Sequence, residues 1–333
     1  MTDIHDRRHG QLHDRLYDRI CGAVLASALG DAFGAPYEGG LVERLLWLVL
    51  GRQGGKRRWT DDTQMSVDVI ESLLACERVE QDDLARRFAR SYRWSRGYGP
   101  GAEKLLKRIR QGEPWQIANR AVFPNGSFGN GGAMRAAPIG LFYGAERERR
   151  LVRAVRDATV VTHAHPVGQD GAVIIALTTA LVCLDHPVQE IFKRLRLHVQ
   201  TLDVQNRLAV AERLLHAEHP VLPKQVASEL GNGIRAKDSC VTAFSIGLAL
   251  REAPFSHLLT YIRKVGGDTD TIGAMAGAIW GASCGYRQLS EDLLQCLEKR
   301  QFLEELAHRF ADVAVRRMRE TAWNVPWPNN RMG

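Results

Sequence analysis

The sequence GGDTDTIGAMAGAIWGA at residues 266–282 begins with an acidic turn and continues into a run that is nearly free of charge. Glycine and alanine make up most of the run from Ile272 to Ala282. A helix that is apolar all round is typical of a protein interior, and small residues allow close packing there. We therefore predict a tightly packed, buried helix with Asp268 and Asp270 at its amino end.

A second acidic segment, Thr60-Asp61-Asp62-Thr63, precedes another helical pattern. We call residues 60–63 the first acidic motif and residues 266–271 the second acidic motif. Their carboxylates and hydroxyls are hard oxygen ligands, which suit Mg²⁺, Mn²⁺ or Ca²⁺ better than zinc or copper. Asp and Thr are also ordinary helix N-caps, and capping is the alternative interpretation of either motif alone. Because buried carboxylates need a partner that offsets desolvation, we predict that the two motifs form halves of one metal site.

The composition describes a soluble chain. Of its 333 residues, 45% are hydrophobic and 25% are charged, which fits one large domain or two medium ones. The six cysteines are scattered, so neither a zinc spacing nor a disulfide framework emerges. The first ten residues lack an apolar signal core, and no uncharged run reaches the roughly 18 residues of a membrane span. We expect a cytoplasmic protein that does not cross a membrane.

The net charge of +7 favours anionic ligands. Basic clusters such as Lys56-Arg57-Arg58 also fit solvated helix faces. No interleaved aromatic pattern indicates a surface for stacking bases, so we expect no direct nucleic-acid binding. A small substrate that carries phosphate fits this balance.

Three further segments suggest ligand contacts. A glycine- and proline-rich loop ends at Glu38, which is a candidate acid, base or metal neighbour, or an exposed loop glutamate. The glycines of residues 123–135 let the backbone approach a ligand closely, and the start of a helix there would favour phosphate. The segment matches neither a Walker A loop nor a dinucleotide fingerprint. Its two phenylalanines could sandwich a purine or belong to the core. His163 and His165 form a His-x-His pair without a third nitrogen or sulfur ligand nearby.

Helical periods recur along the chain and no convincing β alternation appears. We predict an all-α protein of about a dozen helices, with its glycine and acidic loops gathered at one end around a metal cleft. Residues 16–322 would form a single compact domain, after a disordered or loosely packed segment at 1–15 and before an irregular tail at 323–333.

Several segments together resemble the ADP-ribosylglycohydrolase family. In chain order they are Gly30-Asp31 with Tyr37-Glu38, Thr60-Asp61-Asp62-Thr63, Gly129 to Arg135, Thr162-His163, and Gly266 to Thr271. The resemblance covers residues 16 to 286 and implies an all-helical fold with two metal ions, usually Mg²⁺ or Mn²⁺. It also implies cleavage at the anomeric carbon of an attached ADP-ribose. Gly97-Tyr98-Gly99, residues 123–135 and residues 229–234 are similar to the branch that acts on serine-linked and poly-ADP-ribose.

Carried over by position, the resemblance implies a role for each matching residue. The metal ligands would be Thr60, Asp61, Asp62, Asp268, Asp270 and Thr271, and the catalytic residues Glu38, Asp62 and Asp270. Phe123 would lie against adenine, and the substrate would also contact Gly99, Gly126, Ser127, Phe128, Gly129 and Asn130. The ribose pocket would be lined by His163, Asn232, Gly233 and Ile234. Phe128 stands where that branch has tyrosine, and the spacing from Phe123 to Ser127 is one residue shorter, so the adenine platform departs from the family pattern.

The function implied is a metal-dependent hydrolase of the O-glycosidic bond of ADP-ribose on protein serine, in poly-ADP-ribose or in O-acetyl-ADP-ribose. Its partners would be ADP-ribosylated proteins or small molecules that contain ADP-ribose, and the family implies a monomer. Two alternatives remain: hydrolysis of arginine-linked ADP-ribose, an N-glycosidic bond, and a non-catalytic module that binds ADP-ribose. The second alternative does not require the acidic motifs and Glu38, which the chain retains.

Overall fold

Helices make up nearly the whole fold of this computed structural model, which describes residues 2–38, 47, 51–145 and 148–322. The α-helices are α1 (Thr2–Gly34), α3 (Asp61–Cys76), α4 (Gln81–Ser91), α5 (Pro100–Arg110), α6 (Trp115–Val122), α7 (Ala137–Tyr143), α8 (Glu148–Thr159), α9 (Pro166–Cys183), α10 (Val188–His198), α11 (Leu202–Leu215), α12 (Pro223–Leu230), α13 (Ala236–Ala249), α14 (Phe255–Val265), α15 (Thr269–Cys284), α16 (Glu291–Gln295) and α17 (Arg300–Ala322). Short 3₁₀ helices lie at Ala35–Tyr37, Trp94–Arg96 and Tyr286–Gln288. The described residues thus hold 16 α-helices in one compact domain, which confirms the all-α class with more helices than predicted.

One small hairpin interrupts the helices. Strands β1 (Arg52–Gln53) and β2 (Lys56–Arg57) pair antiparallel within the connector before the first acidic motif. This hairpin was not predicted, because two-residue strands are too short to produce an alternating pattern.

Helices α1 and α15 form the centre of the domain and run antiparallel. Gly22 lies against Gly281, Gly30 against Gly273, and Gly34 against Thr269. A Cβ atom added to Gly30 would lie 2.0 Å from the carbonyl oxygen of Gly273, so the two backbones are in direct contact. Glycine at these helical positions lets the two helix axes approach more closely than any other residue would allow. This contact confirms the predicted tight packing of the second motif's helix, and it brings the end of α1 to the start of α15.

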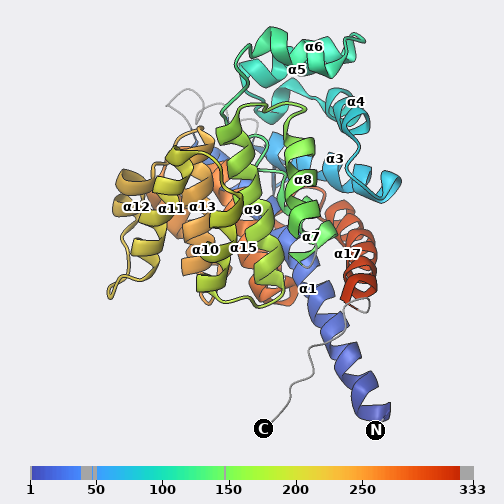
Figure 1. The fold of residues 1–333 in the computed structure, drawn as a ribbon, viewed down its shortest axis with the longest axis vertical. Helices are drawn as coiled ribbons and strands as arrows, with labels where there is room; N and C mark the ends of the chain where they lie inside the picture. The colour runs from blue at the N-terminus through green and yellow to red at the C-terminus, as the bar shows by residue number, and fades with distance from the viewer. Residues whose placement is uncertain (1, 39–46, 48–50, 146–147, 323–333) are drawn as a thin grey trace.

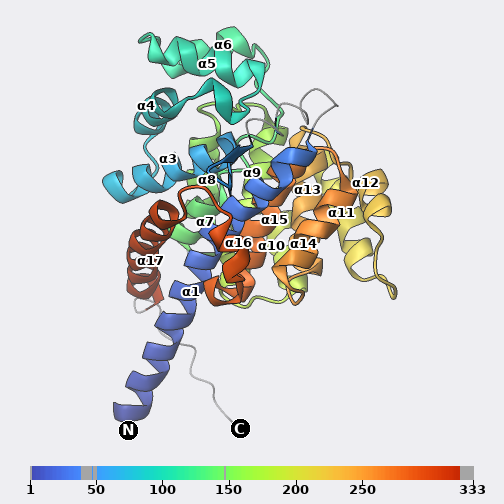
Figure 2. The same cartoon turned by 180° about the vertical axis from the view of Figure 1, so that it is seen from behind.

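The remaining helices surround this pair in layers (Figures 1 and 2). Helix α13 packs on α15, α17 packs on α1, and α9 packs on α7, α8 and α13. Helices α4 to α6 lie above the bundle, α3 packs against α1, α7 and α17, and α10 to α12 lie on one flank (Figure 1). The amino end of α1 extends away from the body as a continuous helix from Thr2 (Figure 1). Our expectation of a disordered or loosely packed segment at 1–15 stays a prediction. The predicted irregular tail, 323–333, lies outside the described residues.

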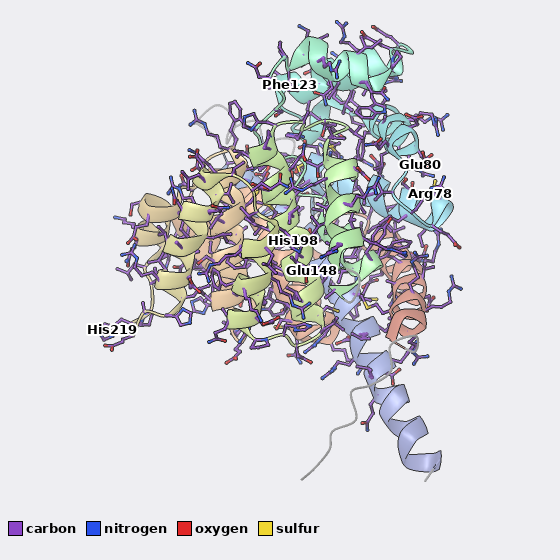
Figure 3. The ribbon with its side chains drawn as sticks, viewed as in Figure 1. Arg78, Glu80, Phe123, Glu148, His198 and His219 are labelled. Atoms are coloured by element: carbon purple, nitrogen blue, oxygen red, sulfur yellow. The ribbon has the colours of Figure 1, made fainter. Side chains whose placement is uncertain are left out.

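Two of these helices are long and apolar enough to cross a membrane by length and composition. They cover Gly10–Tyr37 and Pro166–Cys183, and 72% and 83% of their most apolar windows are buried within the protein. Figure 3 shows Arg78 and Glu80 at one edge of the molecule and His219 at the opposite edge. The burial of these two helices in the bundle accounts for their apolar composition, since helices in a protein core have the same character.

Candidate active site

The second acidic motif is held in place by an asparagine from a different loop. Gly266 and Gly267 adopt φ angles of 71° and 78°, which only glycine takes up without strain. Asn232 donates its side-chain amide to the carbonyl of Val265 at 2.9 Å, and its own carbonyl accepts the backbone N–H of Asp268 at 2.8 Å. The Thr269 hydroxyl donates to the carbonyl of Gly34 at 2.9 Å, which ties the motif to the end of α1. These bonds fix the direction in which Asp268 and Asp270 leave the backbone.

The first acidic motif is anchored by Asp31 of α1. Its carboxylate is fully buried and accepts the backbone N–H groups of Thr60 and Thr63 at 3.0 Å each, together with the Thr63 hydroxyl. Thr60 is the N-cap of α3 and accepts the N–H of Asp62 at 3.2 Å. The capping interpretation therefore holds for Thr60. It does not account for Asp61 and Asp62, whose side chains form no cap.

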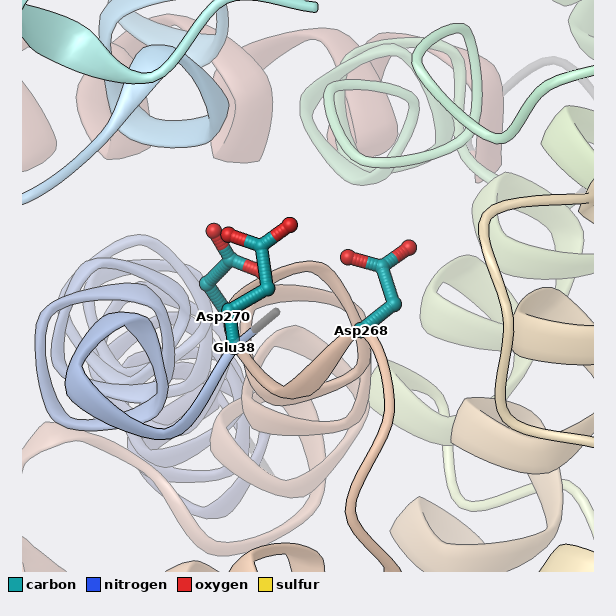
Figure 4. Close-up of side chains that lie close together, drawn as sticks. All are labelled: Glu38, Asp268 and Asp270. Carbon is teal, nitrogen blue, oxygen red and sulfur yellow. The ribbon is translucent and has the colours of Figure 1, made fainter. Parts of the chain in front are cut away.

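The two motifs meet across 209 residues of sequence. The Thr271 hydroxyl donates to Oδ1 of Asp62 at 3.4 Å. Carboxylate oxygens of Glu38, Asp268 and Asp270 lie within 4.8 Å of one another, as Figure 4 shows. Glu38 follows the 3₁₀ turn Ala35–Tyr37 at the end of α1, so the antiparallel contact of α1 with α15 brings it beside Asp270. The predicted convergence of the two motifs with the loop glutamate is therefore present in the fold.

Burial dominates the electrostatics of this cluster. Desolvation, followed by repulsion from neighbouring carboxylates, raises the pKa of Asp61, Asp62 and Asp270 well above the ordinary value. The pKa of Asp268 is also raised, chiefly by burial, while hydrogen bonds from Asp270, Asn130 and Thr271 oppose that shift. For Asp31, burial raises the pKa to about 6 despite the hydrogen bonds from Thr63 and Thr60. A cation between these groups would offset both the desolvation and the repulsion.

The residues present fit a divalent metal. Among the described residues, Oδ2 of Asp62 is a buried oxygen without a hydrogen-bond partner. Such an atom is costly to bury unless something outside the protein satisfies it. The donor set is made entirely of carboxylate and hydroxyl oxygens, which is the preference of Mg²⁺ and Mn²⁺. Of the predicted ligands, Asp268 and Asp270 form the metal-capable group with Glu38. Asp61, Asp62 and Thr271 line the same pocket, whereas the Thr60 hydroxyl caps α3 and does not line it.

The acidic cluster lies at one end of a pocket of about 290 Å³. Several predicted substrate residues line it: Gly99, Phe123, Ser127, Gly129, Asn130, His163 and Ile234. A Cβ added to Gly101 would lie 2.4 Å from Cζ of Phe123, so this glycine makes room for the aromatic ring. Asn130 connects the pocket to the acidic end, because its amide donates to Asp268 and, at 2.8 Å, to Ser239.

Four other predicted substrate residues do not line the pocket. Phe128 has 49% of its surface exposed, lies edge-on to His165 and has the Arg235 guanidinium 5.6 Å from its ring centre. Gly126 packs under the backbone of His165, Asn232 holds the second acidic motif, and Gly233 is exposed. The structure thus places Phe123 in the pocket and Phe128 outside the pocket wall, so the two rings do not enclose the cavity together.

The His-x-His pair does not act as a unit. Nδ1 of His165 accepts the N–H of Val167 at 3.2 Å and caps α9. Nδ1 of His163 lies 2.7 Å from the Thr162 hydroxyl. Within the described ranges, the metal-capable cluster contains carboxylates and neither histidine.

Three functional residues were not assigned from sequence: Asp31, Arg135 and Thr162. Arg135 and Thr162 line the pocket, and Asp31 supports the first motif. All three fall within segments that carried the family resemblance, which was the available signal. Their roles depend on long-range hydrogen bonds that no local pattern reveals.

An all-α domain whose helix ends converge into a carboxylate cluster that lines a pocket has the make-up of an enzyme with a candidate metal site in its active centre. A family model described as ADP-ribosylglycohydrolase matches residues 12–320. The chain is 34% identical to the human protein named ADP-ribosylhydrolase ARH3, over 72% of this chain and 74% of that protein. It is 32% identical to an uncharacterized protein of Archaeoglobus fulgidus, over 78% of this chain and 81% of the relative.

A solved structure, described as an ADP-ribosylglycohydrolase-related protein complex, superposes with a TM-score of 0.68 at 25% identity. That similarity covers 90% of this chain and 99% of the other. The chain belongs to the ADP-ribosylglycohydrolase family, which confirms the resemblance inferred from its motifs.

Proposed function

We propose that this protein is a metal-dependent ADP-ribosylhydrolase that cleaves the anomeric O-glycosidic bond of ADP-ribose on protein serine, in poly-ADP-ribose or in O-acetyl-ADP-ribose. The observation that carries the proposal is the position of the acidic cluster, with Glu38 beside Asp268 and Asp270, at the end of a pocket that also holds Phe123. The family membership and the name of the ARH3 relatives support this class of substrate.

The residues of the acidic cluster divide into those that would bind metal and one, Glu38, that would transfer a proton. Asp61, Asp62, Asp268, Asp270, Thr60 and Thr271 would hold Mg²⁺ or Mn²⁺. When bound, such ions supply positive charge that binds ribose hydroxyls and polarises water. Glu38 is only half-buried and lies at the end of a loop, so it can reach both pocket and solvent. In the proposed reaction its carboxyl group gives a proton to the leaving acceptor oxygen or takes one from the attacking water.

The rest of the pocket binds and orients the ADP-ribose. Phe123 offers an aromatic surface for adenine, and the glycines at 129 and 131 bring backbone groups close to the ligand. His163 faces this glycine segment from the other wall. The net positive charge of the protein favours the approach of a diphosphate.

The release of free ADP-ribose tests this proposal. Serine-linked peptide, arginine-linked peptide, poly-ADP-ribose and O-acetyl-ADP-ribose would be compared, each with Mg²⁺, with Mn²⁺ and after chelation. We expect turnover of one or more O-linked substrates that stops on chelation and returns with metal. Turnover confined to the arginine-linked peptide would replace the proposed linkage with the N-glycosidic one. Tight binding of ADP-ribose with no turnover of any substrate would identify a binding module instead.

A further inference from the structure

A buried chain of three side chains connects the pocket wall to the core. The Arg135 guanidinium is buried, and its Nη2 donates to the Thr162 hydroxyl at 2.6 Å. That hydroxyl lies 2.7 Å from Nδ1 of His163. The same arginine donates from Nη1 to the Gly131 carbonyl, contacts Sδ of Met65 at 3.7 Å and lies 4.5 Å over the Phe88 ring. The arginine is therefore fixed from several sides, and its orientation determines the rest of the chain.

The directions of these hydrogen bonds follow from their chemistry. A guanidinium has donors only, so the Thr162 oxygen must accept from Arg135. A hydroxyl oxygen has two acceptor sites but only one proton. Thr162 is buried, and among the described residues its hydroxyl contacts only Arg135 and Nδ1 of His163, so its proton has an acceptor only if Nδ1 accepts it. A neutral imidazole whose Nδ1 accepts carries its proton on Nε2. The arginine thus selects one of the two tautomers of His163 without touching it.

The surroundings also keep the imidazole uncharged. Burial, and then the positive charge of Arg135, lower the pKa of His163 to about 3. Gly129 and Gly131 lie against the ring, and a Cβ added to Gly168 of α9 would lie 3.5 Å from the Cβ of His163. His165 faces away as the cap of α9, and Asp61, Asp62 and Asp268 line the same pocket. The cation that acts on His163 is Arg135.

The remaining nitrogen is available to a ligand. Nε2 of His163 has no hydrogen-bond partner among the described residues, and the ring lines the pocket. A Cβ added to Gly131 would lie 3.0 Å from Nε2 and 2.7 Å from Cε1, so glycine at this position leaves the ring edge uncovered. We propose that Arg135 and Thr162 are positioning residues that present His163 as a neutral imidazole whose Nε2–H donates to an acceptor oxygen of the ADP-ribose. The identity of the ligand rests on the proposed function, whereas the tautomer does not.

The tautomer can be measured on the full-length protein without substrate. Long-range ¹⁵N–¹H correlation of labelled histidine distinguishes an Nε2–H ring from an Nδ1–H ring. We expect His163 to remain Nε2–H and neutral from pH 5 to pH 8. Thr162→Val should produce mixed tautomers, Thr162→Ser should restore the native one, and Thr179→Val should change nothing. Thr179 is a matched control because its buried hydroxyl bonds only the Ile175 carbonyl within α9.

Kinetics test the positioning role separately. We expect Thr162→Val to raise KM for the best O-linked substrate about 3- to 10-fold with kcat within about twofold, since one well-placed hydrogen bond contributes about 0.5–1.5 kcal/mol. Thr162→Ser should recover most of the affinity, and melting curves would identify any variant that fails to fold.

Two results would overturn the proposal: a native His163 found as Nδ1–H or titrating near its ordinary pKa, or a tautomer change in Thr162→Val with KM unaltered. If no substrate is turned over, the proposed function fails while the spectra still decide the tautomer.

Discussion

The substitution Gly30→Ala tests whether the contact between α1 and α15 sets the geometry of the active site. The added Cβ would lie 2.0 Å from the Gly273 carbonyl oxygen, whereas ordinary contact begins near 3.4 Å. The helices would have to separate by 1.4 Å, which is 3.4 minus 2.0. Both partners are backbone, so no side chain can rotate out of the way.

The expected loss follows from two opposing effects. Overpacking of a core costs about 1–3 kcal/mol, and a backbone-to-backbone clash belongs at the upper end of that range. Alanine recovers at most about 1 kcal/mol through its higher helix propensity. We expect the free energy of unfolding to fall by about 2 kcal/mol. Because a displacement of about 1 Å can cost about 100-fold in rate, turnover should fall by a similar factor as Glu38 moves away from Asp268 and Asp270.

Chemical denaturation and the ADP-ribose release assay measure these two effects. Gly10→Ala is the matched control, because it makes the same change in the same helix where no atom lies within 4 Å of the added Cβ. That variant should be as stable as the native protein or up to about 1 kcal/mol more stable, with unchanged turnover. If Gly30→Ala behaves like Gly10→Ala in both assays, close packing of these helices does not determine the site.

Three further substitutions address single groups. Asp62→Asn should reduce turnover at least about 100-fold and lower the metal content measured by elemental analysis. The metal-free variant should be more stable than the metal-free native protein, because the substitution removes one of several repelling carboxylates. Unchanged metal content would exclude Asp62 as a ligand. Glu38→Gln should lower kcat about 100-fold or more with metal content retained, and a loss of metal would show that Glu38 is a ligand instead. Asp68 is buried in α3 and accepts from Ser91, and burial raises its pKa to about 7. The pKa of Asp68 in the folded state therefore lies above its value in the unfolded chain. Its contribution to the free energy of unfolding is complete below about pH 4 and is lost as the pH rises through about 7, and the loss is on the order of 4 kcal/mol. Asp68→Asn should flatten that part of a stability-versus-pH curve, and a curve parallel to the native one would show that another group titrates.

Local sequence patterns predicted the parts of this fold that depend on short-range order. The small-residue run after Asp270 predicted the buried helix α15. The meeting of the two acidic motifs is a long-range contact, and it was predicted instead from the need of buried carboxylates for a shared cation. The number of helices was underestimated because charged amphipathic stretches such as 191–215 contain two helices, α10 and α11, separated by a short break. The β hairpin was missed because its strands are only two residues long.

The parts that were not predicted depend on pairs of residues far apart in the sequence. Asp31 supports Thr60 from another helix, and Asn232 holds Asp268 from another loop. The family resemblance implied a ribose contact for Asn232, which stays a prediction. In the structure its side-chain amide donates to the Val265 carbonyl and its own carbonyl accepts from Asp268. Phe128 is aromatic but faces His165 and Arg235, so of the two phenylalanines Phe123 is the one that lines the pocket.

The supporting residues explain how a cluster of buried acids can exist in a stable protein. Each carboxylate of the cluster raises the pKa of its neighbours, so the arrangement is unfavourable without a cation. Asp31, Asn232 and Thr269 fix the backbone on which these side chains sit, so the backbone does not move apart to relieve the repulsion. Asp31 and Thr269 lie beside the glycine contacts that hold α1 and α15 together. The repulsion within the acidic cluster is therefore opposed by the close packing of α1 and α15, and a metal ion bound between the carboxylates would reduce that repulsion.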